Sequence, residues 1–329
     1  MTDRDVTVLR VGDPGITTVQ DLGRPGLSRF GIGLNGAGDR HAAAVATALV
    51  GNSPGSPLLE TTATGWSFTL DRPALVAVTG AADRVTVAAQ PQPAWQTLVV
   101  PAGRPVVVEP PDRGWRTYVA IGGALEAERT LGSVAPDPLL GVGTRLEAGD
   151  DLTVRTRFAG FTHPHTVIPV FRFPVDHAAP GHAWEIAVTP GPEAGEFAPD
   201  TWETLGEFEV GRDSDYVGLR LLGHAPARRG RAEMISRGVP IGAVEVPPTD
   251  GLLVLLRGRL VTAGYPVLGV ATTVATDRLA QARPGDGIRF RPCSTADAVA
   301  DARREAADLS ELARRVQRAL RASGVERLH

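Results

Sequence analysis

Apolar and polar residues follow one another in short runs along most of the chain, without helical spacing. Segments rich in Val, Leu, Thr and Ile are separated by Gly, Pro and Asp, for example at residues 74–79, 97–100, 106–109 and 117–121. Short strands with turn residues between them are typical of β-barrels and β-sandwiches. The pattern therefore predicts a mainly β protein with few helices.

Two segments do show helical spacing. The first runs from Asp39, a candidate N-cap, through apolar residues at 42, 45, 46 and 49 to a stop at Gly51. In the second, which starts at Ser294, apolar residues are three and four apart, at Val299, Ala302, Ala306, Leu309, Ala313, Val316 and Leu320. This seam of mainly small residues makes a weak coiled coil, so we expect the helix to pack on the body or on a partner subunit.

The length of 329 residues is too great for one core and indicates two domains. Residues 158–183, rich in Pro, His and Phe, are the predicted linker between β domains at 1–157 and 184–293, and 294–329 form the C-terminal amphipathic helix. Two similar segments, AGDDLTVR at 148–155 and PGDGIRFR at 284–291, each read as a Gly-Asp turn before a strand. They suggest that the two β domains are related.

Charge and cysteine content exclude several partners. With 34 basic and 37 acidic residues the net charge is −3, which gives no field to attract nucleic acid or an anionic membrane. The single cysteine, Cys293, excludes an internal disulfide, and the N-terminus lacks the apolar core of a signal peptide. Since no apolar run approaches the ~20 residues of a transmembrane helix, we expect a cytoplasmic protein.

Every one of the 34 basic residues is an arginine, so the chain contains no lysine. A Walker-type phosphate loop, a Schiff base and the usual biotin attachment all need a lysine amine. We therefore expect no covalently bound cofactor. If ATP or biotin takes part, it acts through partner subunits.

Two tempting motifs fail on their context. GIGLNG at 31–36 matches the dinucleotide fingerprint, but no apolar strand precedes it and no βαβ pattern follows. It is better explained as a tight loop whose amides approach a ligand near a helix N-terminus. His163, His165, His177 and His182 lie in the predicted linker without a regular metal-ligand spacing, which favours a solvated connector over a metal site.

A serine hydrolase is not supported, because the chain has neither a Gly-x-Ser-x-Gly elbow nor a Ser/Lys pair. Polar residues instead accompany glycines in two loops, at 17–26 and 257–266. Such loops can hold a planar polar ligand by arginine and backbone contacts. The alternative is two ordered turns, with Asp21 paired to Arg24 and Tyr265 packed over a proline.

These loops belong to an ordered series of motifs that spans about residues 6–292. In the first half the motifs lie at residues 17–26, 36–39, 49–52, 59–61, 118–123 and 131–133. In the second half they lie at residues 191–192, 218–221, 238–242, 246–248, 264–266 and 281–285. In this order the chain resembles the family that includes allophanate hydrolase subunit 2, the KipA-type proteins and the C-type component of 5-oxoprolinase, a family that is biotin-dependent carboxyltransferase-like.

The resemblance implies two cyclophilin-like β-barrel domains and a partner, the subunit 1 or KipI-type protein, in a hetero-oligomer. Related domains carry carboxyl transfer to urea in urea carboxylase, and other members act in ATP-dependent 5-oxoproline cleavage. The implied function is a subunit of an ATP-dependent amide-hydrolysing or carboxyltransferase complex acting on a small amide: 5-oxoproline, urea or allophanate. The alternative is a non-catalytic regulatory subunit, a KipA-like antagonist of a kinase inhibitor.

The second-half motif departs from the family pattern at three positions. The family usually has a glutamine where this chain has Glu245, an aspartate where it has Gly258 and a glycine where it has Ala263. The missing aspartate removes a candidate substrate-orienting or acid/base group, and Glu245 replaces an amide that both donates and accepts with an acceptor-only charge.

Side-chain chemistry in these loops gives the candidate site. Asp21, Arg24 and Glu245 are the candidate catalytic residues: Arg24 would hold a carboxylate or ureido oxygen, and Asp21 or Glu245 would be the general base. The amides around Gly36 would face developing negative charge. The candidate substrate-binding residues are Gln20, Asn35, Gly36, Asp39, Glu60, Thr262, Gly264 and Tyr265. No metal ligand is expected.

Overall fold

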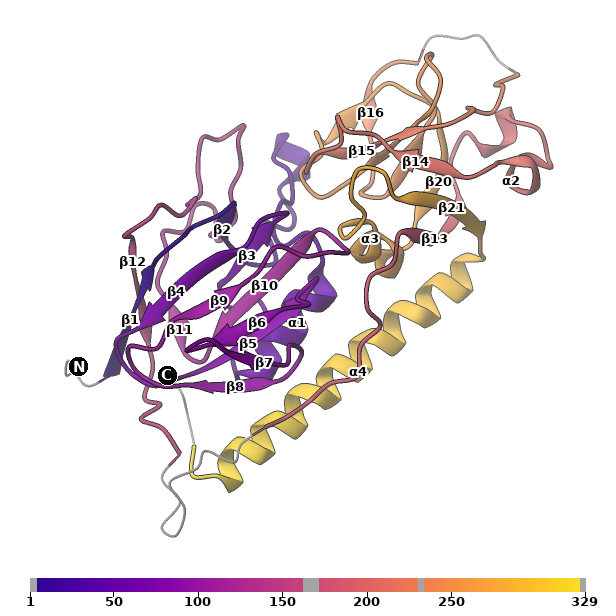
Figure 1. Cartoon of the computed structure of the whole chain (residues 1–329). Coiled ribbons are helices and arrows are strands. Elements are labelled where there is room, and N and C mark those ends of the chain that lie inside the picture. Colours follow the sequence, from indigo (N-terminus) through magenta and orange to yellow (C-terminus); the bar gives the residue numbers. More distant parts are fainter. Residues whose placement is uncertain (1–4, 162–171, 230–233, 326–329) are drawn as a thin grey trace. The chain divides into compact units, whose positions relative to one another are not determined.

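The computed structural model describes residues 5–161, 172–229 and 234–325 (Figure 1). The chain forms two compact units, each described here by itself. The first unit consists of Met1–Gly23, Arg40–Ala179 and Ala306–His329, and the second of Arg24–Asp39 and Pro180–Glu305. The loop that leads into the first helix therefore belongs to the second unit, although both of its neighbours in sequence belong to the first.

The first unit is built from two antiparallel sheets. The seven-stranded sheet has the order β11 (Ala124–Leu125), β12 (Asp151–Arg155), β1 (Val6–Val11), β4 (Trp66–Leu70), β9 (Val106–Val108), β6 (Val85–Val87) and β7 (Gln90–Gln92). The five-stranded sheet has the order β2 (Thr17–Gln20), β3 (Leu58–Thr62), β10 (Arg116–Ile121), β5 (Ala74–Gly80) and β8 (Thr97–Val100). Four of these strands, β5, β8, β9 and β10, confirm the segments expected from the apolar runs.

Alternating apolar side chains of both sheets form one core, in which the Trp66 and Phe68 rings stack 4.7 Å apart. Helix α1 (Arg40–Leu49) packs on β5 and β10 (Figure 1). The helix ends as expected, at Gly51 with φ +75°, a left-handed conformation that glycine adopts at low cost. Thr79 Oγ1 donates to the Ala42 carbonyl at 2.7 Å, which ties the helix to the sheet.

The second unit is a closed seven-stranded barrel. Its strands follow the order β13 (Ala183–Pro190), β20 (Val267–Ala271), β17 (Ala243–Glu245), β18 (Leu252–Leu255), β15 (Gly218–Leu222), β14 (Phe208–Val210) and β21 (Gly287–Pro292). Parallel pairing of β13 with β21 closes the barrel. Outside it lie the two-stranded ribbon β16 (Arg237–Gly238) and β19 (Thr262–Ala263), the helices α2 (Thr201–Thr204) and α3 (Thr273–Leu279), and the short 3-10 helices η2 (Ser28–Phe30) and η3 (Ala194–Glu196).

Helix α4 (Thr295–Ala322) confirms the C-terminal helix. Of its predicted seam, Val316 and Leu320 are buried, whereas Val299 near its start is 41% exposed. The Arg315 guanidinium lies 5.3 Å from the centre of the Phe173 ring. No helix within the described ranges is both long and apolar enough to cross a membrane.

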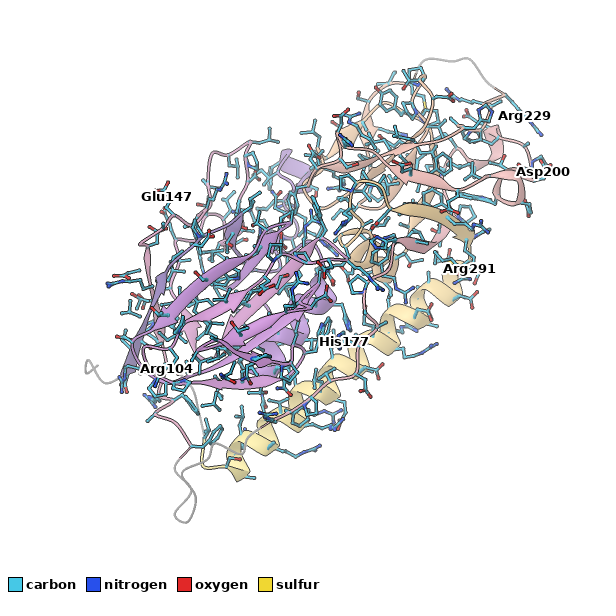
Figure 2. The ribbon with its side chains drawn as sticks, in the orientation of Figure 1. Arg104, Glu147, His177, Asp200, Arg229 and Arg291 are labelled. Atoms are coloured by element: carbon cyan, nitrogen blue, oxygen red, sulfur yellow. The ribbon has the colours of Figure 1, made fainter. Side chains whose placement is uncertain are left out.

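The mainly β class with few helices is thus confirmed, with a closed barrel in the second unit. Two of the linker histidines, His163 and His165, lie outside the described residues. The His177 ring stacks on Trp95 at 4.6 Å (Figure 2). His182 Nδ1 lies 3.1 Å from Asp286 Oδ1. The described residues contain no cluster of three or more potential metal ligands.

The two Gly-Asp turns have the same hydrogen bonds. In the first unit, the Gly149 amide donates to the Val11 carbonyl at 2.9 Å, and the Val11 amide donates to Asp150 at 2.8 Å. In the second unit, Gly285 and Asp286 bond Val210 in the same way, at 2.8 and 2.9 Å. The shared sequence pattern therefore corresponds to a shared turn that pairs with an antiparallel neighbour.

The aspartate side chains of the two turns carry different loads. Each accepts from the amide three residues earlier: Asp150 from Glu147 at 2.7 Å (Figure 2) and Asp286 from Arg283 at 3.1 Å. Asp286 is 1% exposed and also accepts from Trp184 Nε1 at 2.8 Å. It therefore ties the linker end of β13 to the closing strand.

We predict that Asp286→Ala lowers the free energy of unfolding by about 2–4 kcal/mol, because it removes several bonds to one buried carboxylate. The matched change Asp150→Ala, in the equivalent turn, should cost about 1 kcal/mol. Urea denaturation of the full chain measures both. Equal losses for the two variants would contradict the unequal roles of the two turns.

Candidate functional site

The glycine-rich loop at residues 31–36 is preceded by the 3-10 helix η2 and not by a strand. Helix η2 ends at Gly31, with φ +80°, and the backbone is left-handed again at Asn35 (φ 53°) and Gly36 (φ 87°). A dinucleotide fingerprint needs a strand directly before the glycines. The interpretation as a tight loop is therefore confirmed.

Tyr216 and Arg257 of the barrel unit hold this loop. The Asn35 amide donates to the Arg257 carbonyl at 3.2 Å, and the Tyr216 hydroxyl donates to the Gly36 carbonyl. Arg257 Nε donates to the Gly38 carbonyl at 3.0 Å. None of the hydrogen bonds within the described ranges uses the Gly36 amide.

Two further barrel residues complete the attachment. Arg257 Nη2 lies 2.6 Å from Asp277 Oδ1 on α3, and both side chains are almost fully buried. Gln281 Nε2 donates to Asp39 Oδ2 at 2.8 Å. A buried ion pair with satisfied hydrogen bonds fixes geometry more than it adds stability. The loop is thus held in one conformation by side chains more than 170 residues away, a separation visible in the 180 residues between Gly36 and Tyr216.

Tyr216, Arg257 and Gln281 were not among the candidate site residues. Arg257 and Gln281 each begin one of the family motifs, at 257–266 and 281–285, which was the available signal. Tyr216 lies outside the motifs, so the sequence offered no comparable signal for it.

Tyr216 also explains the missing aspartate. A Cβ atom on Gly258 would lie 2.2 Å from Tyr216 Cδ1, far inside contact distance. The Gly258 amide donates to the Tyr216 carbonyl at 3.1 Å. The ring therefore occupies the position in which a side chain at 258 would begin.

Glu245 is a buried carboxylate at the end of β17. It is 1% exposed, and its Oε1 atom has no hydrogen-bond partner within the described residues. Burial raises the pKa of the Glu245 carboxyl to about 7, and the positive charge of Arg237 opposes this increase. A carboxyl with this pKa can exchange a proton near neutral pH.

The remaining second-half candidates lie on and after the outer ribbon. Thr262 pairs with Gly238 across the ribbon, and Gly264 follows it. The Tyr265 side chain is 41% exposed. The Val246 amide donates to the Pro266 carbonyl at 2.9 Å, so the segments that carry Glu245 and Tyr265 run side by side.

Asp21, in the first unit, has both carboxylate oxygens occupied. Ser133 Oγ and the Gly23 amide donate to Oδ1 at 2.6 and 2.8 Å. The Val134 amide donates to Oδ2 at 3.0 Å, and Arg129 is the ion-pair partner at 3.4 Å. The pairing with Arg24 that the sequence suggested is therefore wrong, because the donors to Asp21 come from a segment about 110 residues later in the chain, with separations of 112 and 113.

Gln20 and Glu60 lie on neighbouring strands of the five-stranded sheet. Both are about 95% buried, and Arg116 Nε lies 3.5 Å from Glu60 Oε1. Gln20 Nε2 donates to Thr18 Oγ1 at 3.1 Å, while its Oε1 has no partner among the described residues. Arg116 is thus a further buried polar residue that the candidate set missed.

The predicted residues therefore divide between the units. The second unit contains Arg24, Asn35, Gly36, Asp39, Glu245, Thr262, Gly264 and Tyr265. The first unit contains Gln20, Asp21 and Glu60. Arg24, 2% exposed, is attached through its amide to the Leu34 carbonyl at 2.7 Å, which makes it part of the glycine-rich loop.

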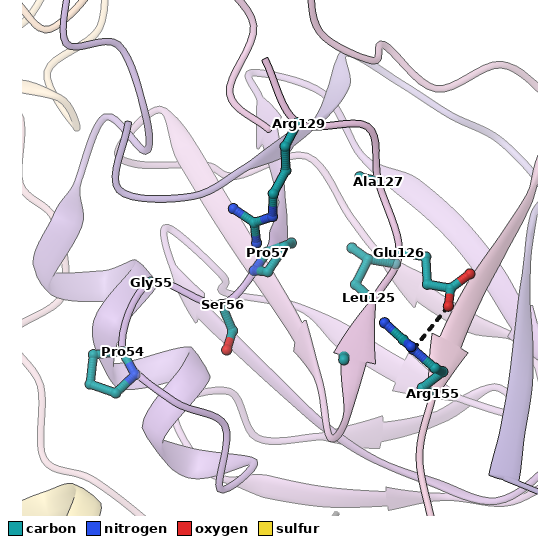
Figure 3. A pocket seen from close by; sticks show the side chains of 10 residues that line it. Pro54, Gly55, Ser56, Pro57, Leu125, Glu126, Ala127, Arg129 and Arg155 are labelled. Carbon is teal, nitrogen blue, oxygen red and sulfur yellow. Dashed lines mark ion pairs between the residues drawn. The ribbon is translucent and has the colours of Figure 1, made fainter. Parts of the chain in front are cut away.

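The first unit also has a surface hollow of about 490 Å³ (Figure 3). It is lined by residues 54–57 and 124–127 together with Arg129 and Arg155. Arg155 pairs with Glu126 at 2.9 Å, and both side chains are nearly half exposed. No candidate residue lines the hollow, although Arg129 connects it to Asp21.

Residues 30–292 match the family described as "Carboxyltransferase domain, subdomain A and B". The C-type component of the Escherichia coli 5-oxoprolinase is 28% identical over 291 residues, which are 86% of this chain and 90% of that protein. The "Putative urea carboxylase" of Emericella nidulans is 29% identical over 306 residues, which are 85% of this chain and 24% of that protein.

Among solved structures, the Kluyveromyces lactis urea carboxylase has the same fold, with a TM-score of 0.81 and 23% identity. The similarity covers 93% of this chain and 29% of that one. Since the family match extends over well more than half of the sequence, this chain belongs to the carboxyltransferase domain family.

Proposed function

We propose that this chain is the amide-binding subunit of a heteromeric, ATP-dependent amide-hydrolysing or carboxyltransferase complex that acts on 5-oxoproline, urea or allophanate. The observation that supports this most is the buried Glu245 carboxyl, whose pKa lies near 7. The names of the relatives, a 5-oxoprolinase component and a putative urea carboxylase, describe two such reactions.

In this proposal Glu245 handles the substrate's proton. When an amide or ureido nitrogen forms a new bond to carbon it must lose its N–H proton, and a carboxylate with a pKa near 7 can accept it. Asp21, the other candidate base, already accepts from four donors and is therefore better suited to hold the backbone around Ser133.

The glycine-rich loop supplies the electrostatic part. The Gly36 amide would face the oxygen on which negative charge develops, and Arg24 would hold a carboxylate or ureido oxygen. Tyr216 and Arg257 keep the loop in position before substrate arrives, so little reorganisation accompanies the reaction.

Other chains would supply the activated carboxyl or phosphoryl donor. The sequence has no lysine to carry biotin or to form a Walker-type phosphate loop. We therefore expect a subunit 1 (KipI-type) partner in a cytoplasmic hetero-oligomer, and ATP or biotin to act through partner subunits.

The first test is ATP-dependent cleavage of 5-oxoproline by this chain co-expressed with its genomic neighbours, compared with the same preparation lacking it. We expect turnover to disappear when the chain is omitted and to return when purified chain is added back. Turnover that persists without the chain would overturn the proposal, as would the absence of turnover on 5-oxoproline, urea and allophanate alike.

Glu245→Gln tests the proton-transfer role. We expect kcat/KM of the complex to fall by about a hundredfold or more, because a neutral amide cannot accept the proton. The matched control Glu209→Gln, an exposed glutamate on the neighbouring barrel strand β14, should leave kcat/KM unchanged. Equal activity of the two variants would exclude Glu245 as the base.

The same variant has a pH signature in stability. The pKa of Glu245 rises from its ordinary 4.5 to about 7 in the folded chain, so the folded state binds more protons between these values. The wild-type free energy of unfolding should therefore fall by up to about 3 kcal/mol as pH rises from 4.5 to 7. Denaturant titrations at several pH values should show this contribution in Glu209→Gln but not in Glu245→Gln.

The regulatory alternative is favoured by one feature, the Tyr216 ring that fills the position of the usual aspartate. Gly258→Asp should lower the free energy of unfolding by about 1–3 kcal/mol through overpacking against that ring. Gly206→Asp is the matched control, since a Cβ there meets nothing within 4 Å. Urea denaturation compares them. If the two variants are equally stable, Tyr216 does not block position 258.

A further inference from the structure

Arg259 is a buried arginine in the turn that holds the glycine-rich loop. Its amide donates to the Leu256 carbonyl at 3.2 Å, and its side chain is 8% exposed. Nε donates to the Val239 carbonyl at 3.0 Å. Nη1 is fully buried and finds no acceptor within the described ranges.

Arg257, two residues earlier, shows what a satisfied arginine looks like in the same turn. Its guanidinium contacts both the Gly38 carbonyl and the Asp277 carboxylate. No carboxylate of the described chain lies within ion-pair distance of Arg259. Burial lowers the pKa of Arg259, yet a guanidinium keeps its proton in proteins. The turn therefore buries a positive charge without a counter-ion.

The position of Arg259 connects this charge to the candidate site. A Cβ atom on Gly33 would lie 3.4 Å from the Arg259 carbonyl, so only a residue without a side chain lets the loop come this close without a shift. Val239, the acceptor of Arg259 Nε, belongs to a small apolar cluster with Val267. Glu245 pairs with Val267 across β17 and β20, so both unsatisfied charged residues border the same cluster.

We infer that Arg259 binds the carboxylate of the substrate, so that this chain selects amides that carry a carboxylate over neutral ones. The inference rests on the proposed function and narrows its substrate class. A carboxylate would give Nη1 its missing acceptor and the guanidinium its counter-ion. A neutral amide such as urea offers only a carbonyl oxygen and would leave the charge uncompensated.

The test uses two pairs of probes that differ in the carboxylate: 5-oxoproline with 2-pyrrolidinone, and N-carbamoylglycine with urea. Isothermal titration calorimetry measures each on the full chain, alone and in its purified complex. We expect the carboxylated member to bind at least about tenfold more tightly in one pair or both. The pair with the larger ratio distinguishes a cyclic from a ureido substrate.

Arg259→Met should reduce this ratio to about one while leaving the melting temperature unchanged or higher, because it removes an uncompensated buried charge. Arg220→Gln, on strand β15 of the same unit and exposed, is the control that should change neither. Arg259→Lys keeps the charge and should retain part of the preference. A purely structural Arg259 would instead give a lower melting temperature with an unchanged ratio.

The inference is overturned if the wild type binds carboxylated and neutral probes equally, binds none of them, or keeps its preference in Arg259→Met. These results are separate from the omission test. Turnover that depends on the chain without any carboxylate preference would leave the proposed function intact and reject the role of Arg259. A preference lost in Arg259→Met without chain-dependent turnover would do the opposite.

Discussion

The attachment of one loop to a distant part of the chain is the constraint on which the candidate site depends. Arg257 is central to it, because its guanidinium bonds the Gly38 carbonyl on one side and the Asp277 carboxylate on the other. Removing either partner would leave a buried charge unsatisfied, which is strongly destabilising. The loop from Arg24 to Asp39 therefore behaves as part of the barrel unit, although helix α1 directly follows it in the first.

This attachment marks the limit of what sequence patterns could predict. The strands β5 and β10 and the helices α1 and α4 were predictable, because apolar periodicity is a local property of a few consecutive residues. The division of the site was not. Residues 20 and 21 belong to the first unit and Arg24 to the second, and no periodicity or turn rule records such a change of partner. Asp21 shows the same limit, since its donor Ser133 is 112 residues away.

The repeated Gly-Asp turn shows how similar sequence can acquire different roles. In both units the glycine and aspartate bond the neighbouring strand with nearly equal distances, which is what a shared origin of the two β units would leave behind. In the second unit the aspartate has become buried and holds Trp184 as well. The octapeptide pattern could therefore predict the turn, whereas the added role came from residues 102 and 104 positions away.

Glu245 looks like a charge change relative to the glutamine that is usual in the family, but its surroundings reduce that difference. With a pKa of about 7, a large share of the side chain is protonated at neutral pH. A protonated carboxyl carries one hydroxyl donor and one carbonyl acceptor, so it can replace a glutamine amide in both respects. Unlike glutamine, it can also give up and regain its proton. The same burial that makes the substitution costly in the charged form thus keeps the amide-like pattern and adds a group able to transfer protons.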